Sequence, residues 1–263
     1  MDLVHVMREA AGVVAVWKPA GLATQAPPGI PSAESWLRKR LHAGDTTGYL
    51  GVPHRLDRGV SGVVLFAATP RAARQLSRQF ERRQIRKAYL AIVACRAEQA
   101  RETVAALVEA AKIETQAPGD SPGTGGAVAW HDRLEKISDE ARARVVPIDA
   151  VGGREAVTLA RLRCCLPENR LLLELAPLTG RMHQLRVQAA SRGLPVIGDD
   201  LYGKVDEQWT DEPVSDEPVS IAADPRTRPI ALHAYRIEYA DPDSGLDVKI
   251  EAPLPTYWPA AAR

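Results

Sequence analysis

The chain has 263 residues, of which 45% are hydrophobic, and a net charge of +1. This length and composition suffice for one large domain, or two small ones, with a buried core. Charged residues occur from Asp2 onward and no apolar run is long enough to cross a bilayer, so we expect neither a secretory leader nor a membrane span.

The three cysteines, Cys95, Cys164 and Cys165, are few, odd in number and not spaced as metal ligands. We therefore expect no disulfide and no zinc site, and a reducing cytoplasm as the location. A monomer is the simplest expectation for the oligomeric state.

The near-neutral total charge hides two segments of opposite sign. Residues 71–96 contain eight basic side chains and one acid, whereas all charged residues of 206–224 are acidic. A basic segment within a neutral chain is compatible with nucleic-acid binding, and also with an ordinary solvated face.

The first half of the chain predicts alternating strands and helices. We expect strands at 13–17, 63–67 and 89–93, where apolar or β-branched residues cluster. We expect helices at 31–43, with Ser32 as the N-cap, and from Pro70 to about residue 83, with Thr69 as the N-cap.

The second half predicts strands at 156–164, 170–177, 232–240 and 246–252, with a helix over 180–193. Residues 116–127 are rich in Pro and Gly and indicate a mobile loop, and a repeated DEPVS pentad indicates a flexible acidic insertion at 203–228. Because strands occur from end to end without a linker, we predict one α+β domain over 1–263, built on a largely antiparallel sheet flanked by helices and loops.

The segment HRLDRGVSG at 54–62 is the most informative part of the sequence. It places Asp57 between Arg55 and Arg58, on a Gly-containing loop that leads into the predicted strand at 63–67. A carboxylate at the mouth of a buried strand, with cations beside it, is a candidate nucleophile or base.

Two predicted helices carry arginines in informative positions. The helix from Pro70 is amphipathic, and its polar face consists of Arg71, Arg74, Arg78 and Arg82. Four arginines without an interspersed acid suit a phosphate backbone.

In the predicted helix over 180–193, Arg186 lies in the middle of an apolar face. A buried guanidinium needs a carboxylate, because desolvation of an unpaired charge costs several kcal/mol, unless the side chain reaches the rim of the helix. We predict that Arg186 pairs with Asp57 and keeps it charged and oriented.

These segments resemble the RluA-type pseudouridine synthases. HRLDRGVSG resembles the family's HRLDxxTSG, and GRMHQLRVQ with GLPVIGDDLYG resembles its GRTHQIRVH with GHPILGDxxYG. Further matches are VWKPAGL at 16–22, RKAYLA at 86–91 and LHA at 232–234. The five matches span about residues 12–253 in the family's order, and we expect no separate N-terminal S4-type domain.

The resemblance implies that Asp57 is the catalytic residue, that Tyr89 stacks on the target base and moves a proton, and that Arg186 holds Asp57. It also implies that Arg55 fills the space left when the base is flipped out of the RNA. The implied activity is isomerisation of specific uridines in ribosomal or transfer RNA, with RNA as the partner and without a cofactor or metal.

Three positions depart from the family pattern: Val60 replaces Thr, Met182 replaces Thr or Ser, and Gln188 replaces His. They leave open a second hypothesis, an RNA-binding or ribosome-assembly factor that has lost turnover. A third, a hydrolase using Asp57, is weaker because no second carboxylate stands at a suggestive position.

Overall fold

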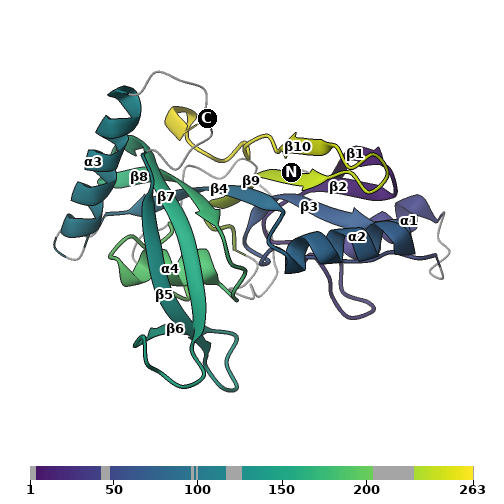
Figure 1. Ribbon diagram of the computed structural model, residues 1–263, viewed down its shortest axis with the longest axis horizontal. Helices are drawn as coiled ribbons and strands as arrows, with labels where there is room; N and C mark the ends of the chain where they lie inside the picture. The colour runs from purple at the N-terminus through teal and green to yellow at the C-terminus, as the bar shows by residue number, and fades with distance from the viewer. Residues whose placement is uncertain are drawn as a thin grey trace, which may run out of the picture. The chain divides into compact units, whose positions relative to one another are not determined.

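The computed structural model describes residues 4–42, 48–95, 98, 100–116, 126–203 and 228–262 (Figure 1). The chain divides into two compact units, one formed by Met1–Lys87 with Asp211–Pro259 and the other by Ala88–Thr210 with Ala260–Ala262. The single domain over 1–263 stays a prediction. Apart from its two end residues, the predicted acidic insertion at 203–228 lies outside the described residues.

The first unit is a mixed sheet with two helices. Its strands are β1 (His5–Ala10), β2 (Val13–Lys18), β3 (Ser61–Ala67), β9 (Leu232–Ala240) and β10 (Asp247–Glu251), neighbours in that order. All neighbours are antiparallel except β3 and β9, which run parallel. The helices are α1 (Ala33–Leu41) and α2 (Pro70–Glu81).

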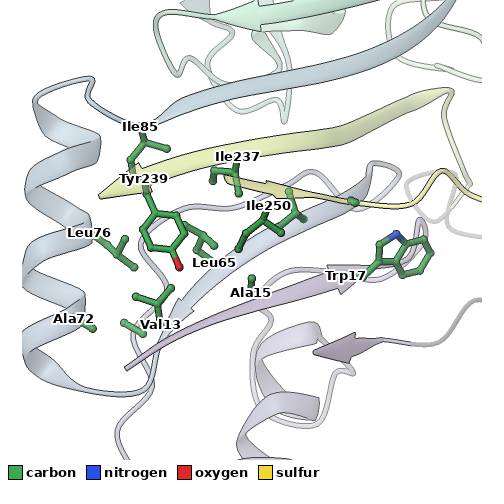
Figure 2. Packing of buried hydrophobic residues seen from close by; sticks show 13 residues of the cluster. Val13, Ala15, Trp17, Leu65, Ala72, Leu76, Ile85, Ile237, Tyr239 and Ile250 are labelled. Carbon is green, nitrogen blue, oxygen red and sulfur yellow. The ribbon is translucent and has the colours of Figure 1, made fainter. Parts of the chain in front are cut away.

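The core of the first unit lies between the sheet and α2 (Figure 2). Val13, Leu65 and Ile237 of the strands belong to one buried cluster with Leu76 of α2, and each is at most 1% exposed. The side-chain amide of Gln79 adds two hydrogen bonds of 2.8 Å to the backbone N–H and carbonyl of Ala240. Apolar burial and this amide pair fix α2 on the sheet.

The second unit is an antiparallel sheet. The strands lie in the order β4 (Arg86–Ala94), β8 (Arg170–Pro177), β7 (Arg154–Leu166), β5 (Val128–Lys136) and β6 (Ala143–Val146), with β4 contributing from Ala88 onward. Helix α3 (Arg101–Gln116) packs against β7 and β5, and α4 (Gln184–Ser191) packs against β5 and β6. A short 3-10 helix, η2, spans Ala260–Ala262.

The predicted α+β class and the largely antiparallel pairing are confirmed. Ser32 and Thr69 cap α1 and α2 as predicted, through hydrogen bonds of 3.0 and 3.1 Å to backbone N–H groups. Helix α4 is shorter than the predicted 180–193. Its N-cap, His183, has a left-handed φ of 52°, so the helix begins only at the next residue, Gln184. Four elements, β1, β5, β6 and α3, were not expected from the sequence. Along the described ranges, no helix is long and apolar enough to cross a membrane.

Candidate functional site

The loop that carries Asp57 is tied to distant parts of the first unit through its backbone. Leu56, just before Asp57, exchanges two buried hydrogen bonds with the Thr24 hydroxyl, at 2.9 and 3.0 Å. After Asp57, the Arg58 carbonyl accepts from Gly21 N at 2.8 Å and the Gly59 carbonyl accepts from Ile230 N at 3.0 Å. Asp57 itself, half-buried, closes a turn in which Val60 N donates to its carbonyl.

Lys18, at the end of β2, lies fully buried beneath this loop. Its ammonium donates to the carbonyls of Pro19 and Leu22 at 2.9 and 2.7 Å, and to that of Arg58 at 3.3 Å. Burial lowers the pKa of Lys18 to about 7, and the nearby charge of Asp57 opposes this shift. Lys18 therefore links the end of β2 to the Asp57 loop by hydrogen bonding and by charge.

Two histidines anchor the ends of the loop. Nε2 of His54 accepts a 2.9 Å hydrogen bond from Leu65 N, and its ring lies 4.8 Å from that of Phe80. Nδ1 of His233 shares a 2.8 Å hydrogen bond with the hydroxyl of Ser61. Desolvation lowers the pKa of His54 to about 3 and that of His233 to about 4, so both rings are neutral at pH 7.

The first departure from the family pattern, Val60, lies inside the protein. Its side chain is 2% exposed, so an apolar residue at this position leaves no hydroxyl group without a hydrogen bond. The substitution thus agrees with its surroundings and leaves the anchoring of the loop intact.

The second unit carries the other two predicted catalytic residues. Tyr89 is half-buried on β4, opposite Leu175 of β8. Arg186 is 7% exposed on α4 and forms two 2.7 Å hydrogen bonds with the carboxylate of Asp199. The expectation that Arg186 is buried against a carboxylate is confirmed, with Asp199 as the partner that the structure identifies. The pairing of Arg186 with Asp57 stays a prediction.

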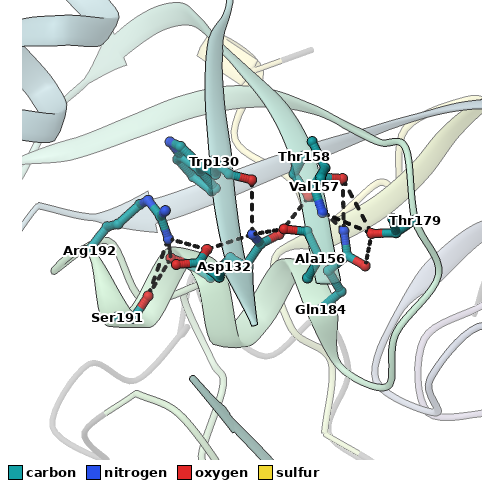
Figure 3. A network of polar contacts seen from close by, with 10 residues as sticks. Trp130, Asp132, Ala156, Val157, Thr158, Thr179, Gln184, Ser191 and Arg192 are labelled. Carbon is teal, nitrogen blue, oxygen red and sulfur yellow. Dashed lines mark hydrogen bonds and ion pairs between the residues drawn. The ribbon is translucent and has the colours of Figure 1, made fainter. Parts of the chain in front are cut away.

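Helix α4 is held by a buried amide network (Figure 3). Gln188 accepts from the Thr158 hydroxyl at 2.6 Å, and its amide N–H₂ donates to Asp132 at 2.6 Å. Gln184 bonds Thr179 at 2.7 Å and the Val157 carbonyl at 3.0 Å. Gln188, where the family has His, is therefore a structural link between α4 and the sheet.

The remaining predicted residues lie at the surface. Arg55 is exposed, and Met182, the third departure, is 37% exposed. Arg71 pairs with Asp243 at 3.0 Å. Arg74, Arg78 and Arg82 are exposed, and within the described ranges no ion pair joins them to an acid.

Sequence reasoning missed Lys18, Thr24 and Asp199. Lys18 and Asp199 fall in segments that resemble the family's, but the residues alone did not indicate their partners. In the described part of the chain, no cluster of three or more His, Cys, Asp or Glu residues could hold a metal ion.

Residues 12–191 match the RNA pseudouridylate synthase family, and the chain belongs to that family. It is 31% identical over 247 residues to the ribosomal large subunit pseudouridine synthase C of Rickettsia typhi, covering 94% of this chain and 66% of that protein. It is 32% identical over 252 residues to the synthase D of Xylella fastidiosa, covering 92% of this chain and 63% of that protein. The chain thus spans about two thirds of the length of these relatives.

The fold is also that of a solved structure, human RNA Pseudouridylate Synthase Domain Containing 1. The two chains superpose with a TM-score of 0.64 at 22% identity, covering 96% of this chain and 84% of the human one. This likeness identifies the fold.

Proposed function

We propose that this protein isomerises a uridine of large-subunit ribosomal RNA to pseudouridine, with Asp57 as the nucleophile. Family membership and the names of the relatives support the reaction and the ribosomal substrate. Transfer RNA is the other candidate substrate class.

The observation that carries the proposal is the anchoring of the Asp57 loop. Segments at 18–24 and 228–233 bind residues 56, 58, 59 and 61, mostly through backbone atoms of the loop. Because these bonds fix the backbone on both sides of Asp57, they restrict the positions that its carboxylate can take. Such ordering before the substrate binds is a condition for efficient nucleophilic catalysis.

The reaction breaks the N1–C1′ bond, turns the uracil and joins C5 to C1′. The proton lost from C5 is balanced by the one gained at N1, so no redox partner or group donor is consumed. Asp57 would add to the sugar or the base, or stabilise the freed sugar, while Tyr89 stacks on the uracil and moves a proton. Arg186 would orient Asp57.

The exposed arginines suit the binding of folded RNA. Arg55 lies two residues before Asp57, and its planar guanidinium can stack on bases next to the flipped uridine. Arg74, Arg78 and Arg82 form a row of exposed cations along α2 at intervals of four residues, suited to consecutive phosphates.

A catalytically silent RNA-binding factor is the competing function. Of the three departures that raised it, Val60 is buried in agreement with its apolar character and Gln188 belongs to the α4 network. The departures at 60 and 188 therefore have structural explanations that do not require a loss of turnover.

The activity is tested by mapping pseudouridine in ribosomal and transfer RNA of a deletion strain complemented with defined variants. We expect one or more large-subunit sites to disappear on deletion and to return with the wild type and with Asp149→Asn, an exposed carboxylate control. Asp57→Asn should not restore them, yet should bind the RNA within a few-fold of wild type. Unchanged pseudouridine at every site after deletion would refute the proposed enzymatic activity. Loss confined to transfer RNA would refute the assignment of a ribosomal substrate.

The phosphate contacts are tested by the salt dependence of RNA binding. The double variant Arg78→Ala with Arg82→Ala should lower the slope of log K against log salt by about 0.7–0.9 for each lost contact. Arg71→Ala is the matched control, because this arginine already pairs with Asp243. An equal slope for the double variant and wild type would show that these arginines do not contact phosphates and that the polar face of α2 is an ordinary solvated surface.

A further inference from the structure

Arg186 is held along one full edge of its guanidinium group. Nε lies 2.7 Å from Oδ2 of Asp199, and Nη2 lies 2.7 Å from Oδ1. This is the parallel, two-bond geometry that fixes an arginine in direction as well as in position. The Asp199 side chain is completely buried and that of Arg186 is 8% exposed, so the pair is shielded from solvent.

Asp199 is itself fixed by the turn that follows it. Its Oδ1 accepts from Leu201 N at 3.1 Å and from Tyr202 N at 3.4 Å. Its carbonyl accepts a 2.7 Å hydrogen bond from Gly203 N. One carboxylate therefore organises the 199–203 turn and binds the arginine at the same time.

The same turn places Tyr202 over the guanidinium. The Arg186 carbon Cζ lies 5.2 Å from the centre of the Tyr202 ring, within the range of a cation–π contact. The Tyr202 hydroxyl accepts from Ala143 N at 2.8 Å and lies 2.9 Å from Nδ1 of His183, the residue before α4. Arg186 thus has a carboxylate along one edge and an anchored ring over its face.

We propose that Asp199, supported by Tyr202, is a positioning residue for the isomerisation, acting through Arg186. The inference rests on the proposed function, in which Arg186 orients Asp57. A free arginine side chain carries about 2 kcal/mol of rotamer entropy, which would have to be lost each time it oriented a nucleophile. The clamp removes that freedom as the protein folds, before RNA binds.

Asp199 also determines the charge that Arg186 offers. With Asp199 alone the pair is neutral, and a second carboxylate on the other guanidinium edge, formed by Nη1 and Nη2, would give a net charge of −1. Arg186 can therefore orient Asp57 while the three side chains together keep a net negative charge. An arginine without Asp199 would form an ion pair of zero net charge with the carboxylate that it orients.

The test compares Asp199→Asn with Asp132→Asn. Asp132 pairs with Arg192 at 2.8 Å, just after the same helix, and is also shielded, with 12% of its side chain exposed. Both substitutions remove a carboxylate from an arginine near α4, but only the first touches Arg186. The measurements are the melting temperature, the dissociation constant for a large-subunit ribosomal RNA transcript labelled with [5-³H]uridine, and the single-turnover rate of tritium release.

We expect both variants to melt at lower temperature and to bind RNA within a few-fold of wild type. Asp199→Asn should lower the single-turnover rate by about 100-fold, the cost of a displacement of about 1 Å in the reacting groups. Asp132→Asn should keep the rate within a few-fold of wild type. Equal losses in the two variants, or an unchanged rate for Asp199→Asn, would overturn the inference.

Tyr202→Leu and Tyr202→Phe keep the inference testable if Asp199→Asn does not fold. The leucine variant removes the ring and should slow turnover at least several-fold more than the phenylalanine variant, which retains it; equal rates would count against the clamp. A wild type that forms no pseudouridine in any RNA would instead refute the proposed function. An active wild type with an inactive Asp57→Asn and a fully active Asp199→Asn would refute only the role of Asp199.

Discussion

Gly62, the last residue of the HRLDRGVSG segment, offers a sharp test of how the Asp57 loop joins the sheet. It has a φ of +120° and pairs with Ala234 where β3 and β9 run parallel. A Cβ atom at this position would lie 2.3 Å from the Ala234 carbonyl oxygen and 2.6 Å from its nitrogen. Gly62→Ala therefore requires both a strained backbone and a separation of the two strands.

The expected loss of stability follows from these two costs. Strain in a sparsely populated backbone region costs about 1–3 kcal/mol. Parting the strands weakens local backbone hydrogen bonds, each with a net value of about 1 kcal/mol. Together they predict a destabilisation of about 4 kcal/mol, which belongs to the exceptional tail of single substitutions.

Gly245→Ala is the matched control. Gly245 also has a positive φ, of +71°, but an added Cβ would meet nothing within 4 Å. This variant carries only the left-handed backbone cost of about 1–2 kcal/mol. Urea unfolding of the wild type and both variants gives the comparison, and a Gly62→Ala loss no greater than that of Gly245→Ala would refute the close approach of β3 and β9.

Three further predictions concern stability. Because the pKa values of His54 and His233 are lowered from 6.5 to about 3 and about 4, the unfolded chain binds more protons below pH 6.5. The free energy of unfolding should therefore fall as pH drops from about 6.5 to 4, by about 1.4 kcal/mol per unit of pKa difference, and His54→Phe should reduce this slope in urea titrations. The pKa of Lys18 is lowered from 10.5 to about 7, so stability should rise between pH 7 and 10 in the wild type and less so in Lys18→Met; parallel slopes would contradict the burial of a charge. Thr24→Val should cost about 2–4 kcal/mol, because the buried N–H and carbonyl of Leu56 both lose their partner, and a loss below 1 kcal/mol in urea unfolding would count against that pairing.

Elements that depend on caps and on the spacing of apolar residues were predictable from the sequence. Helix α2 begins where a capping Thr precedes Pro70, and its apolar face packs on the sheet as the helical period indicates. The short strand β1 is half polar and carries no comparable pattern, since none of its residues is fully buried and the strand depends on pairing with β2.

The site was predictable in its residue types but not in its contacts. The apolar surroundings of Arg186 on α4 indicated that it needs a carboxylate, and the structure provides Asp199. Asp199 lies thirteen residues after Arg186, in a turn. The shape of that turn cannot be predicted from helical periodicity. Lys18 likewise occupies the end of an apolar strand, where only the folded loop supplies carbonyls to receive its ammonium.

The contacts of the Asp57 loop also bear on how the protein is made. Ile230 N binds the Gly59 carbonyl, and His233 binds Ser61 across 172 positions of the chain. A growing polypeptide that has just left the ribosome up to residue 200 contains Asp57 but neither of these partners. Organisation of the loop therefore waits for β9, and chain fragments released early would carry Asp57 without the complete support of its loop.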